Sequence, residues 1–353
     1  MIVIRTNLGR CGVTLAVLVA ALFAAMPLGA AEDNAYTVTP LVSDQPGEAT
    51  FLDANLVNAW GLAASSTSPW WVADNETSKS TLYNGNTGQP QALVVSVGTD
   101  SGPTGVVFNG GSGFVVTNGT ASAPARFIFD SEDGLIRGWS PAVDPTNALV
   151  AASGDPGANF KGLGIAGGML YAADFHNGVV DVFDGSWNIV NRFTDPGLPA
   201  GYAPFGIQAI GSQIFVAFAK QDEDAEDEVA GQGLGFVAAF DTGGNLVARV
   251  AQHGLLNAPW GLARAPGDFG RFSGDLLVGN FGDGRINAFE PQANGHFGFR
   301  GQLRDGSGQP IAIDGLWALE FGNGANAGPT NTLFFTAGPD DETHGLFGRI
   351  TAG

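Results

Sequence analysis

The sequence has 353 residues, of which 34 are Asp or Glu and 15 are Lys or Arg, so its formal net charge is −19. This acidic balance argues against nucleic acid and anionic membranes as partners, since both attract basic surfaces. Only 14% of the residues are charged, and the 54 glycines follow no collagen-like period, which is typical of a turn-rich all-β protein.

Residues 1–31 have the features of a secretory signal peptide. Arg5 and Arg10 precede an apolar run over residues 13–26, and small residues at 29–31 lead into the polar residues that follow. The apolar run is too short for a comfortable membrane span. We therefore expect a secreted or periplasmic protein with a single domain over residues 32–353. Its charge would be −21, because 13 basic and 34 acidic residues remain, and it would contain no cysteine, because Cys11 is the only one.

The remaining chain repeats one short phrase, an aromatic or polar residue followed by glycine and an aliphatic residue. Its glycines or alanine are 44 to 57 residues apart, which fits four short strands and their loops, the size of a propeller blade. The six copies are centred on Gly61, Gly105, Gly162, Gly206, Gly261 and Ala318. We expect each copy to begin an innermost strand, with glycine where six strands crowd around one axis.

A second and a third strand are predicted after each copy. The second strands are expected at residues 70–74, 113–118, 169–174, 213–218, 275–280 and 332–337. The third strands end near turn sequences such as "FDG" and "DTGG", where Asp and Gly favour the positive φ angles of hairpins. In the second unit, the third strand is expected within "ARFIFDSEDG", residues 125–134.

A fourth strand is predicted in the first five units, and the sixth unit has none. The segment "YTVTPLVSD", residues 36–44, precedes the first unit and has no other assignment. Pairing it with the last unit would close the ring and remove two exposed sheet edges. The predicted fold is therefore an all-β, six-bladed β-propeller closed by its N-terminal strand.

The repeated pattern resembles the NHL repeat. The resemblance is plainest in "GPTGVV" at residues 102–107, "LYAADFHNGVVDVFDG" at 170–185 and "APWGLA" at 258–263. Nearly all of the chain after residue 31 also resembles an uncharacterised family of secreted bacterial propellers that open with a "YTVTPLVSDQPGEAT" segment. The resemblance implies the fold and export, and it implies no particular activity.

In a propeller, the starts of the first strands and the ends of the second strands lie on one face, so these positions form the candidate site. The first-strand starts include four aromatic residues and one cation, Lys161; the predicted ligand-binding residues are Trp60, Phe205, Trp260 and Trp317. They would form a stacking floor for a sugar or aromatic ligand. The alternative, which we favour, is that the aromatic rings fill the seams between blades and that Lys161 pairs with a neighbouring carboxylate.

The second-strand ends are rich in Asp and Asn, whose oxygen atoms suit Ca²⁺ or another divalent cation. The predicted metal ligands are Asp74, Asn118, Asp174 and Asn280. Such a metal would activate water or polarise a carbonyl, as in gluconolactonase-like propellers, which serve only as an analogy. The alternative is that these residues cap turns through local hydrogen bonds.

Two residues are candidates for proton transfer, His176 in "ADFHNG" and Lys161. His344 is expected in the comparable loop of the last blade. The two histidines would either face one pocket or point to solvent. The segment "KQDEDAEDEVAGQG", residues 220–233, inserts between the second and third strands of the fourth blade. It is either a solvated loop or a lid over the mouth.

Two functions remain open after this reading. The first is a monomeric binding propeller whose top face holds a small molecule, a carbohydrate or a protein, without a cofactor. The second is a metal-assisted hydrolase, lactonase or lyase. The first needs only the scaffold and an aromatic mouth, and we prefer it.

Overall fold

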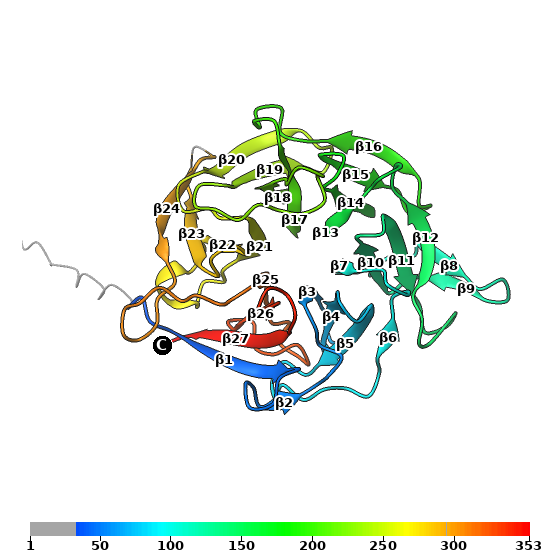
Figure 1. Cartoon of the computed structure of the whole chain (residues 1–353), viewed down its shortest axis with the longest axis horizontal. Coiled ribbons are helices and arrows are strands. Elements are labelled where there is room, and N and C mark those ends of the chain that lie inside the picture. Colours follow the sequence, from blue (N-terminus) through cyan, green and yellow to red (C-terminus); the bar gives the residue numbers. More distant parts are fainter. Residues whose placement is uncertain (1–32, 294) are drawn as a thin grey trace, which may run out of the picture. The chain divides into compact units, whose positions relative to one another are not determined.

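Six sheets, antiparallel except for the short β1–β2 pair, stand around a common axis in the part of the chain that the structure, a computed structural model, describes: residues 33–293 and 295–353 (Figure 1). The predicted signal peptide, residues 1–31, lies outside the described residues. The six-bladed, NHL-like propeller predicted from the repeat is confirmed.

Each of the first five blades has four strands, and its first strand is the innermost one (Figure 1). Blade 1 contains β3 (Ala59–Ala63), β4 (Trp70–Asp74), β5 (Lys79–Tyr83) and β6 (Val95–Ser96). Blade 2 contains β7 (Pro103–Phe108), β10 (Phe127–Ser131), β11 (Leu135–Trp139) and β12 (Leu149–Ser153). Blade 3 contains β13 (Phe160–Ala166), β14 (Met169–Asp174), β15 (Val179–Phe183) and β16 (Ile189–Phe193). Blade 4 contains β17 (Tyr202–Ile210), β18 (Gln213–Lys220), β19 (Phe236–Asp241) and β20 (Leu246–Gln252). Blade 5 contains β21 (Pro259–Arg264), β22 (Leu276–Asn280), β23 (Ile286–Pro291) and β24 (Phe297–Gln302).

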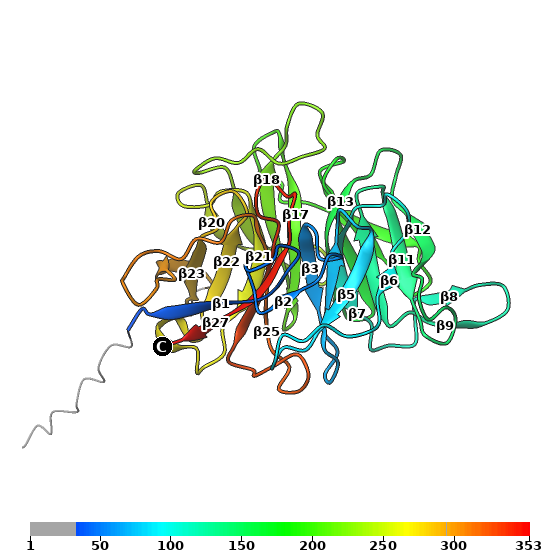
Figure 2. The ribbon, with the colours of Figure 1, turned by 60° about the horizontal axis from the view of Figure 1, so that its bottom comes forward.

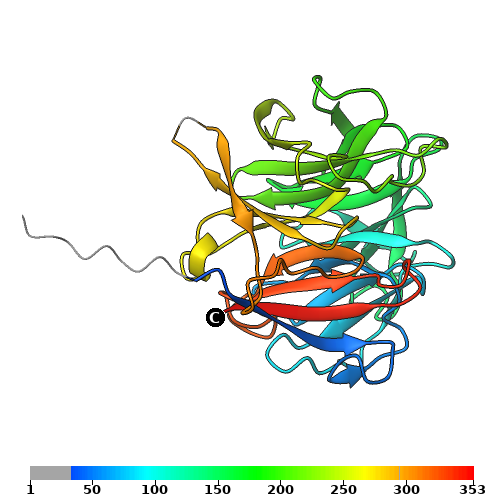
Figure 3. The ribbon, with the colours of Figure 1, turned by 60° about the vertical axis from the view of Figure 1, so that its left-hand side comes forward.

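The sixth blade is completed by the N-terminal segment, as predicted. It contains β25 (Leu316–Phe321), β26 (Leu333–Ala337), β27 (Leu346–Ala352), β1 (Tyr36–Ser43) and β2 (Phe51–Leu52). β1 runs antiparallel to β27, from Tyr36 opposite Ala352 to Ser43 opposite Leu346 (Figure 3). Just after β1, the carboxylate of Asp44 accepts hydrogen bonds from the Gly345 N–H at 2.9 Å and from Nδ1 of His344 at 2.8 Å. His344 lies in the predicted loop, between β26 and β27, and its ring fastens the ring closure and is not among the residues that line the mouth.

Blade 2 corrects one part of the predicted strand order. Residues 113–118, predicted as its second strand, instead contribute β8 (Val115–Thr117) to a separate hairpin with β9 (Ser122–Pro124), which projects from the rim (Figure 2). The true second and third strands are β10 and β11. An inserted hairpin has the same alternating pattern as a blade strand, so the pattern alone could not separate the two.

Glycine in the repeated phrase is required by the approach of neighbouring blades. A Cβ added at Gly61 would lie 2.5 Å from the carbonyl oxygen of Thr104, and one at Gly261 would lie 2.5 Å from that of Trp317. A Cβ at Gly206 would overlap the carbonyl group of Trp260. In the first five blades the innermost strand therefore touches the backbone of the next one directly, and a side chain cannot fit between them, whereas blade 6 has room for the methyl group of Ala318.

Apolar side chains fill the space between adjacent blades. One cluster, for example, joins Ile128 of β10 to Leu170 and Phe183 of blade 3. A separate cluster lies at the axis and contains the four predicted aromatic residues. Within residues 33–293 and 295–353, the helical structure is one 3₁₀ turn, η1 (Gly270–Phe272), and no helix there is long and apolar enough to cross a membrane.

Candidate functional site

The loops between second and third strands surround one end of the propeller axis, as predicted. Loops from blades 1, 2, 4, 5 and 6 line a cavity of about 520 Å³, here called the mouth. Its lining residues are Trp60, Asn75, Glu76, Glu132, Asp227, Glu228, Phe281, Asp341 and Glu342. Six of these nine side chains are carboxylates, so the mouth is strongly acidic.

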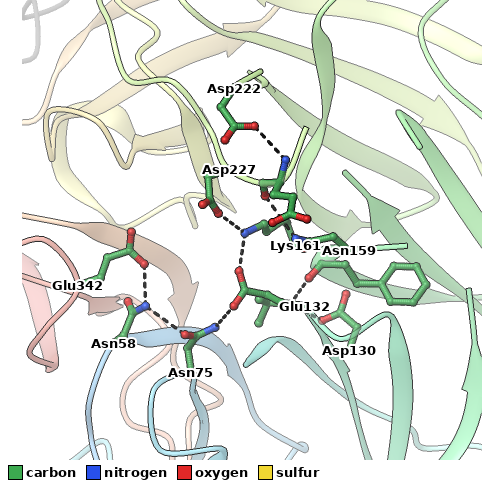
Figure 4. A network of polar contacts seen from close by, with 12 residues as sticks. Asn58, Asn75, Asp130, Glu132, Asn159, Lys161, Asp222, Asp227 and Glu342 are labelled. Carbon is green, nitrogen blue, oxygen red and sulfur yellow. Dashed lines mark hydrogen bonds and ion pairs between the residues drawn. The ribbon is translucent and has the colours of Figure 1, made fainter. Parts of the chain in front are cut away.

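Lys161 is the cation beneath this acidic rim. Its side chain is only 1% exposed, and its ammonium group pairs with Glu132 and, at 2.9 Å, with Asp227 (Figure 4). The ammonium also lies 5.4 Å from the centre of the Trp60 ring, within the range of a cation–π contact. Burial alone would lower the pKa of Lys161, but the charges of Glu132 and Asp227 outweigh burial and raise it. Lys161 is therefore held as a charged structural group, which agrees with the pairing favoured above.

Hydrogen bonds extend this ion pair across blades 1, 2 and 6. Asn75 donates to Glu132 at 3.0 Å, and Asn58 donates to Asn75 at 3.3 Å and to Glu342 at 2.7 Å (Figure 4). Both carboxylates are thereby fixed in position at the rim. Asp340, Asp341 and Glu342 have φ angles of 56°, 52° and 65°. Three successive non-glycine residues in the left-handed region store backbone strain, which is common at functional sites.

Two carboxyl groups of the mouth resist ionisation. Burial raises the pKa of Glu228 to about 8, although the charge of Lys161 opposes this shift. Burial likewise raises the pKa of Glu342, and its hydrogen bond from Asn58 opposes that shift only in part. Mutual repulsion adds to both effects, because further carboxylates lie nearby. A cation entering the mouth would relieve that repulsion.

The four predicted aromatic residues form a stacked cluster under the mouth. The rings of Trp60 and Trp317 stack at 3.6 Å, and Phe205 and Trp260 meet Trp60 edge-on at 6.3 Å. Phe205 and Trp317 are fully buried and act as packing. Trp60 lines the mouth, and its indole N–H has no hydrogen-bond partner among the described residues. Phe281, which the sequence analysis did not single out, stacks on Trp317 at 4.1 Å and lines the mouth as well.

A second cavity, here called the groove, adjoins the mouth. Its volume is about 730 Å³, and Glu132 and Asp227 line both cavities. The groove also exposes the carboxylates of Asp133, Asp155 and Glu226. Asp133 pairs with Arg137 at 2.6 Å and Asp155 pairs with Arg192 at 2.9 Å, so Glu226 is the one of these three acids that has no ion pair in the described chain.

The acidic insertion of blade 4 forms part of both cavities. Asp227 reaches Lys161, the Gln221 side chain donates to the carbonyl of Phe175 at 2.6 Å, and the carbonyl of Glu226 accepts from Asn159 at 3.3 Å. These contacts fold the insertion across the neighbouring blade 3. The insertion is thus held at the rim while most of its acids stay exposed, and its role as a lid stays a prediction.

His176 lies at the edge of this arrangement. It is not among the residues that line the mouth or the groove. Its ring lies beside Gly157 of the groove, where an added Cβ would be 3.3 Å from it. Its predicted role in proton transfer stays a prediction.

The structure places the four predicted metal ligands in separate local turns. Asp74 accepts from Thr81 at 3.2 Å, Asp174 accepts from Asn177 at 2.8 Å, and Asn280 donates to Asp283 at 2.9 Å. Asn118 is not at a second-strand end, because it follows β8 of the β8–β9 hairpin; Ser131, the last residue of β10, occupies the equivalent position. Among the described residues, no group of three or more His, Cys, Asp or Glu side chains is arranged to hold a metal ion. A bound divalent cation stays a prediction.

The residues that the sequence analysis missed are the carboxylates of the mouth. Glu76, Glu132 and Glu342 each lie within a few residues of a second-strand end, and that position was the available signal. The sequence analysis considered only the last residue of each second strand, whereas the side chains that line the mouth belong to the loop residues that follow it.

Solved structures with the same fold include two enzymes. A streptogramin B lyase aligns with a TM-score of 0.53 and 10% identity over 90% of this chain and 98% of the lyase. The soluble aldose sugar dehydrogenase of Escherichia coli aligns with a TM-score of 0.54 and 14% identity over 90% of this chain and all of the dehydrogenase. At these identities the likeness concerns the fold alone.

Sequence relatives are found in Acanthamoeba polyphaga mimivirus. Uncharacterised protein R648 is 34% identical over 328 residues, which span 89% of this chain and 80% of the viral protein. Uncharacterised protein L690 is 31% identical over 334 residues, which span 89% of this chain and 85% of the viral protein. No family model matches the sequence.

Proposed function

We propose that this protein, which belongs to the same family as the mimivirus proteins R648 and L690, is a binding propeller whose mouth takes a small organic cation with more than one amino group. The observation that carries the proposal is the composition of the mouth. Six carboxylates from four blades surround a cavity of about 520 Å³ that has Trp60 and Phe281 in its lining.

The charge of the mouth favours a cation. Lys161 neutralises part of the charge of Glu132 and Asp227, while Glu76, Glu228, Asp341 and Glu342 have no ion pair with a cation of the described chain. A cationic ligand would stabilise these groups in their ionised form. An anionic ligand would add to the repulsion that already raises the pKa of Glu228.

The aromatic residues favour an organic cation over a simple metal ion. The faces of Trp and Phe rings attract ammonium groups and also pack against hydrocarbon. The Lys161 ammonium already makes such a contact with Trp60 at 5.4 Å. Because Trp60 is already stacked on Trp317 and in contact with Lys161, the ring that would receive an amine in the mouth is that of Phe281, which is partly exposed.

The groove supports a ligand with several amino groups. It continues the lining beyond Glu132 and Asp227 to Glu226, which has no ion pair in the described chain and would take a second ammonium, whereas Asp133 and Asp155 already pair with Arg137 and Arg192. A linear oligoamine spans two such positions with one flexible chain. Spermidine is therefore a suitable probe.

The test is isothermal titration of spermidine at pH 8.5 and low ionic strength. Glu342→Gln removes one charge but keeps an oxygen that can accept from Asn58, so folding should be retained. We expect spermidine to bind this variant roughly tenfold more weakly than the native protein, about 1.4 kcal/mol. Glu48→Gln, at an exposed acid that lines neither cavity, should bind as the native protein does. Equal affinity of Glu342→Gln and the native protein would refute the proposal.

We also propose that the protein is exported to the periplasm or the medium. The basic head and apolar run of residues 1–31 support this location. Mass spectrometry of the protein recovered from the periplasm and the medium should show an N-terminus at Glu32. A cytoplasmic protein that retains residues 1–31 would contradict export.

A further inference from the structure

The channel along the axis is built in successive rings of residues, one residue from each innermost strand. One position after the repeated glycine, every blade has an aliphatic residue that lines a narrow part of the channel: Leu62, Val106, Leu163, Ile207, Leu262 and Leu319. This apolar collar lies one step farther from the mouth than the glycines. The next ring consists of Ala63, Val107, Gly164, Gln208, Ala263 and Glu320. Glu320 is thus the one ionisable residue in a ring that is otherwise apolar apart from Gln208.

A cavity of about 190 Å³, here called the vestibule, lies at this end of the channel. Five of the six residues of the second ring line it, and its other walls come from Leu62, Ala64, Val106, Phe108, Ile165 and Ala209. Among these lining residues, Glu320 is the only one that can carry a charge. The vestibule shares no lining residue with the mouth.

The Glu320 carboxyl group has no partner within the described chain, neither a hydrogen-bond donor nor a cation. The strands packed against β25 do not supply one. β3, β22 and β26 carry no ionisable residue, and β21 carries only Arg264, which is exposed and interacts with Asp275. Burial raises the pKa of Glu320 to about 8. The Glu320 side chain is half-buried and lines the vestibule, so its carboxyl group has to be satisfied by water or by a ligand there.

We propose that the vestibule is a second binding site, for a small alkylammonium ion whose charged end pairs with Glu320 and whose hydrocarbon part packs against the apolar walls. An ammonium has three N–H donors. Glu320 accepts from one or two of them, and the side-chain carbonyl of Gln208, in the same lining, accepts from another. This site does not depend on the proposed function of the mouth.

The chemistry of the vestibule selects against other ligands. An anion would meet the carboxylate without any compensating cation. A hydrated metal ion would have to give up its water for a single carboxylate and one amide oxygen, which is too few ligands. An uncharged alkane would leave Glu320 unsatisfied. A short primary amine meets the acid and the apolar walls together.

The test is a titration of the whole protein with n-butylammonium, followed by NMR of methyl groups in Leu62 and Val106, which line the vestibule. We expect both methyl resonances to shift in the native protein. In Glu320→Gln, which keeps the size of the side chain but loses its charge, the apparent affinity should fall at least tenfold. In Ala64→Phe, where an added ring fills the space, the shifts should disappear. Glu48→Gln, at an exposed acid that lines neither the vestibule nor the mouth, serves as the matched control and should bind butylammonium in the vestibule as the native protein does.

Calorimetry adds a second, independent readout. At pH 6.5, below the pKa of Glu320, pairing with an ammonium requires the carboxyl group to lose its proton. Butylammonium binding should therefore release about one proton more in the native protein than in Glu320→Gln, seen as a larger difference in binding heat between phosphate and MES buffers. The proposal would be overturned if the methyl titrations gave the same affinity for the native protein and Glu320→Gln, or if the shifts persisted in Ala64→Phe. So would the absence of any shift in the native protein.

Discussion

The ammonium group of Lys161 lies 2.9 Å from the carboxylate of Asp227, although the two residues belong to different blades and are 66 positions apart. Lys161 is the second residue of β13, the innermost strand of blade 3, and Asp227 lies in the acidic insertion of blade 4. This contact anchors the insertion at the rim of the mouth. Asp227 lines both the mouth and the groove, so this ion pair lies where the two cavities meet.

Removing Lys161 should cost more stability than removing its partner in the insertion. Lys161→Met leaves Glu132 and Asp227 without a cation, and we expect the free energy of unfolding to fall by about 2–3 kcal/mol. Asp227→Asn leaves the Glu132 pair in place, and Asp227 is 72% exposed, so we expect a loss of about 0.5 kcal/mol. Urea unfolding of both variants checks this order. Equal losses would show that Lys161 is not the central group of the network.

The stability of the protein should depend on pH through the buried acids. Burial raises the pKa of Glu228 to about 8, so its contribution to stability is fully present below its ordinary pKa and is lost as pH rises through about 8. We expect the melting temperature to fall between pH 5 and pH 9, and to fall less in Glu228→Gln. Thermal melts in a buffer series measure both slopes. A slope in Glu228→Gln as steep as in the native protein would contradict this assignment, and Glu48→Gln is the control.

The glycines of the repeated phrase should not tolerate alanine. In Gly206→Ala the new Cβ would overlap the backbone of Trp260, and we expect a loss of 3 kcal/mol or more, on the order of the largest effects of single substitutions. Gly267→Ala is the matched control, because a Cβ there meets no atom within 4 Å. The difference between the two variants in urea unfolding measures the blade contact. A small effect at Gly206 would mean that the innermost strands can separate.

The closure of the ring should depend on Asp44. Asp44→Ala removes the acceptor of the Gly345 N–H and of His344, and we expect a loss of about 1–2 kcal/mol. Asp268→Ala changes an exposed acid without an observed side-chain hydrogen bond and should have little effect. Hydrogen exchange of β1 and β27 amides should rise in the first variant only. Unchanged exchange would show that the backbone pairing alone holds the ring closed.

The architecture could be predicted from the sequence because it depends on residues that repeat. Gly61, Gly105 and their equivalents mark each innermost strand, and the unassigned segment at 36–44 has one place to pair. The misplacement of Asn118 has a local cause, since the inserted β8–β9 hairpin has the same pattern as a blade strand.

The mouth was less accessible to sequence reasoning. The sequence predicted that the mouth lies at the face where first strands start and second strands end. It also favoured a neighbouring carboxylate as the partner of Lys161. The side chains that line it, such as Glu132 and Glu342, lie in loops, where no periodicity shows which residue turns inward. Glu320 occupies the same repeat position as Ala63 and Gln208, so aligning the six copies two residues beyond the glycine would have revealed it.

The most direct test of the mouth as a site for organic cations is the NMR spectrum of the indole N–H groups during a spermidine titration. The chain has seven tryptophans, and the Trp60 signal can be assigned by its loss in Trp60→Phe. Trp60 lines the mouth, whereas Trp139, in blade 2, lines neither the mouth nor the groove and donates its N–H to the carbonyl of Pro145 at 3.2 Å. We expect the Trp60 signal to shift in step with spermidine binding while the Trp139 signal stays in place. Saturable binding that leaves Trp60 unmoved would place the cation elsewhere and contradict the account.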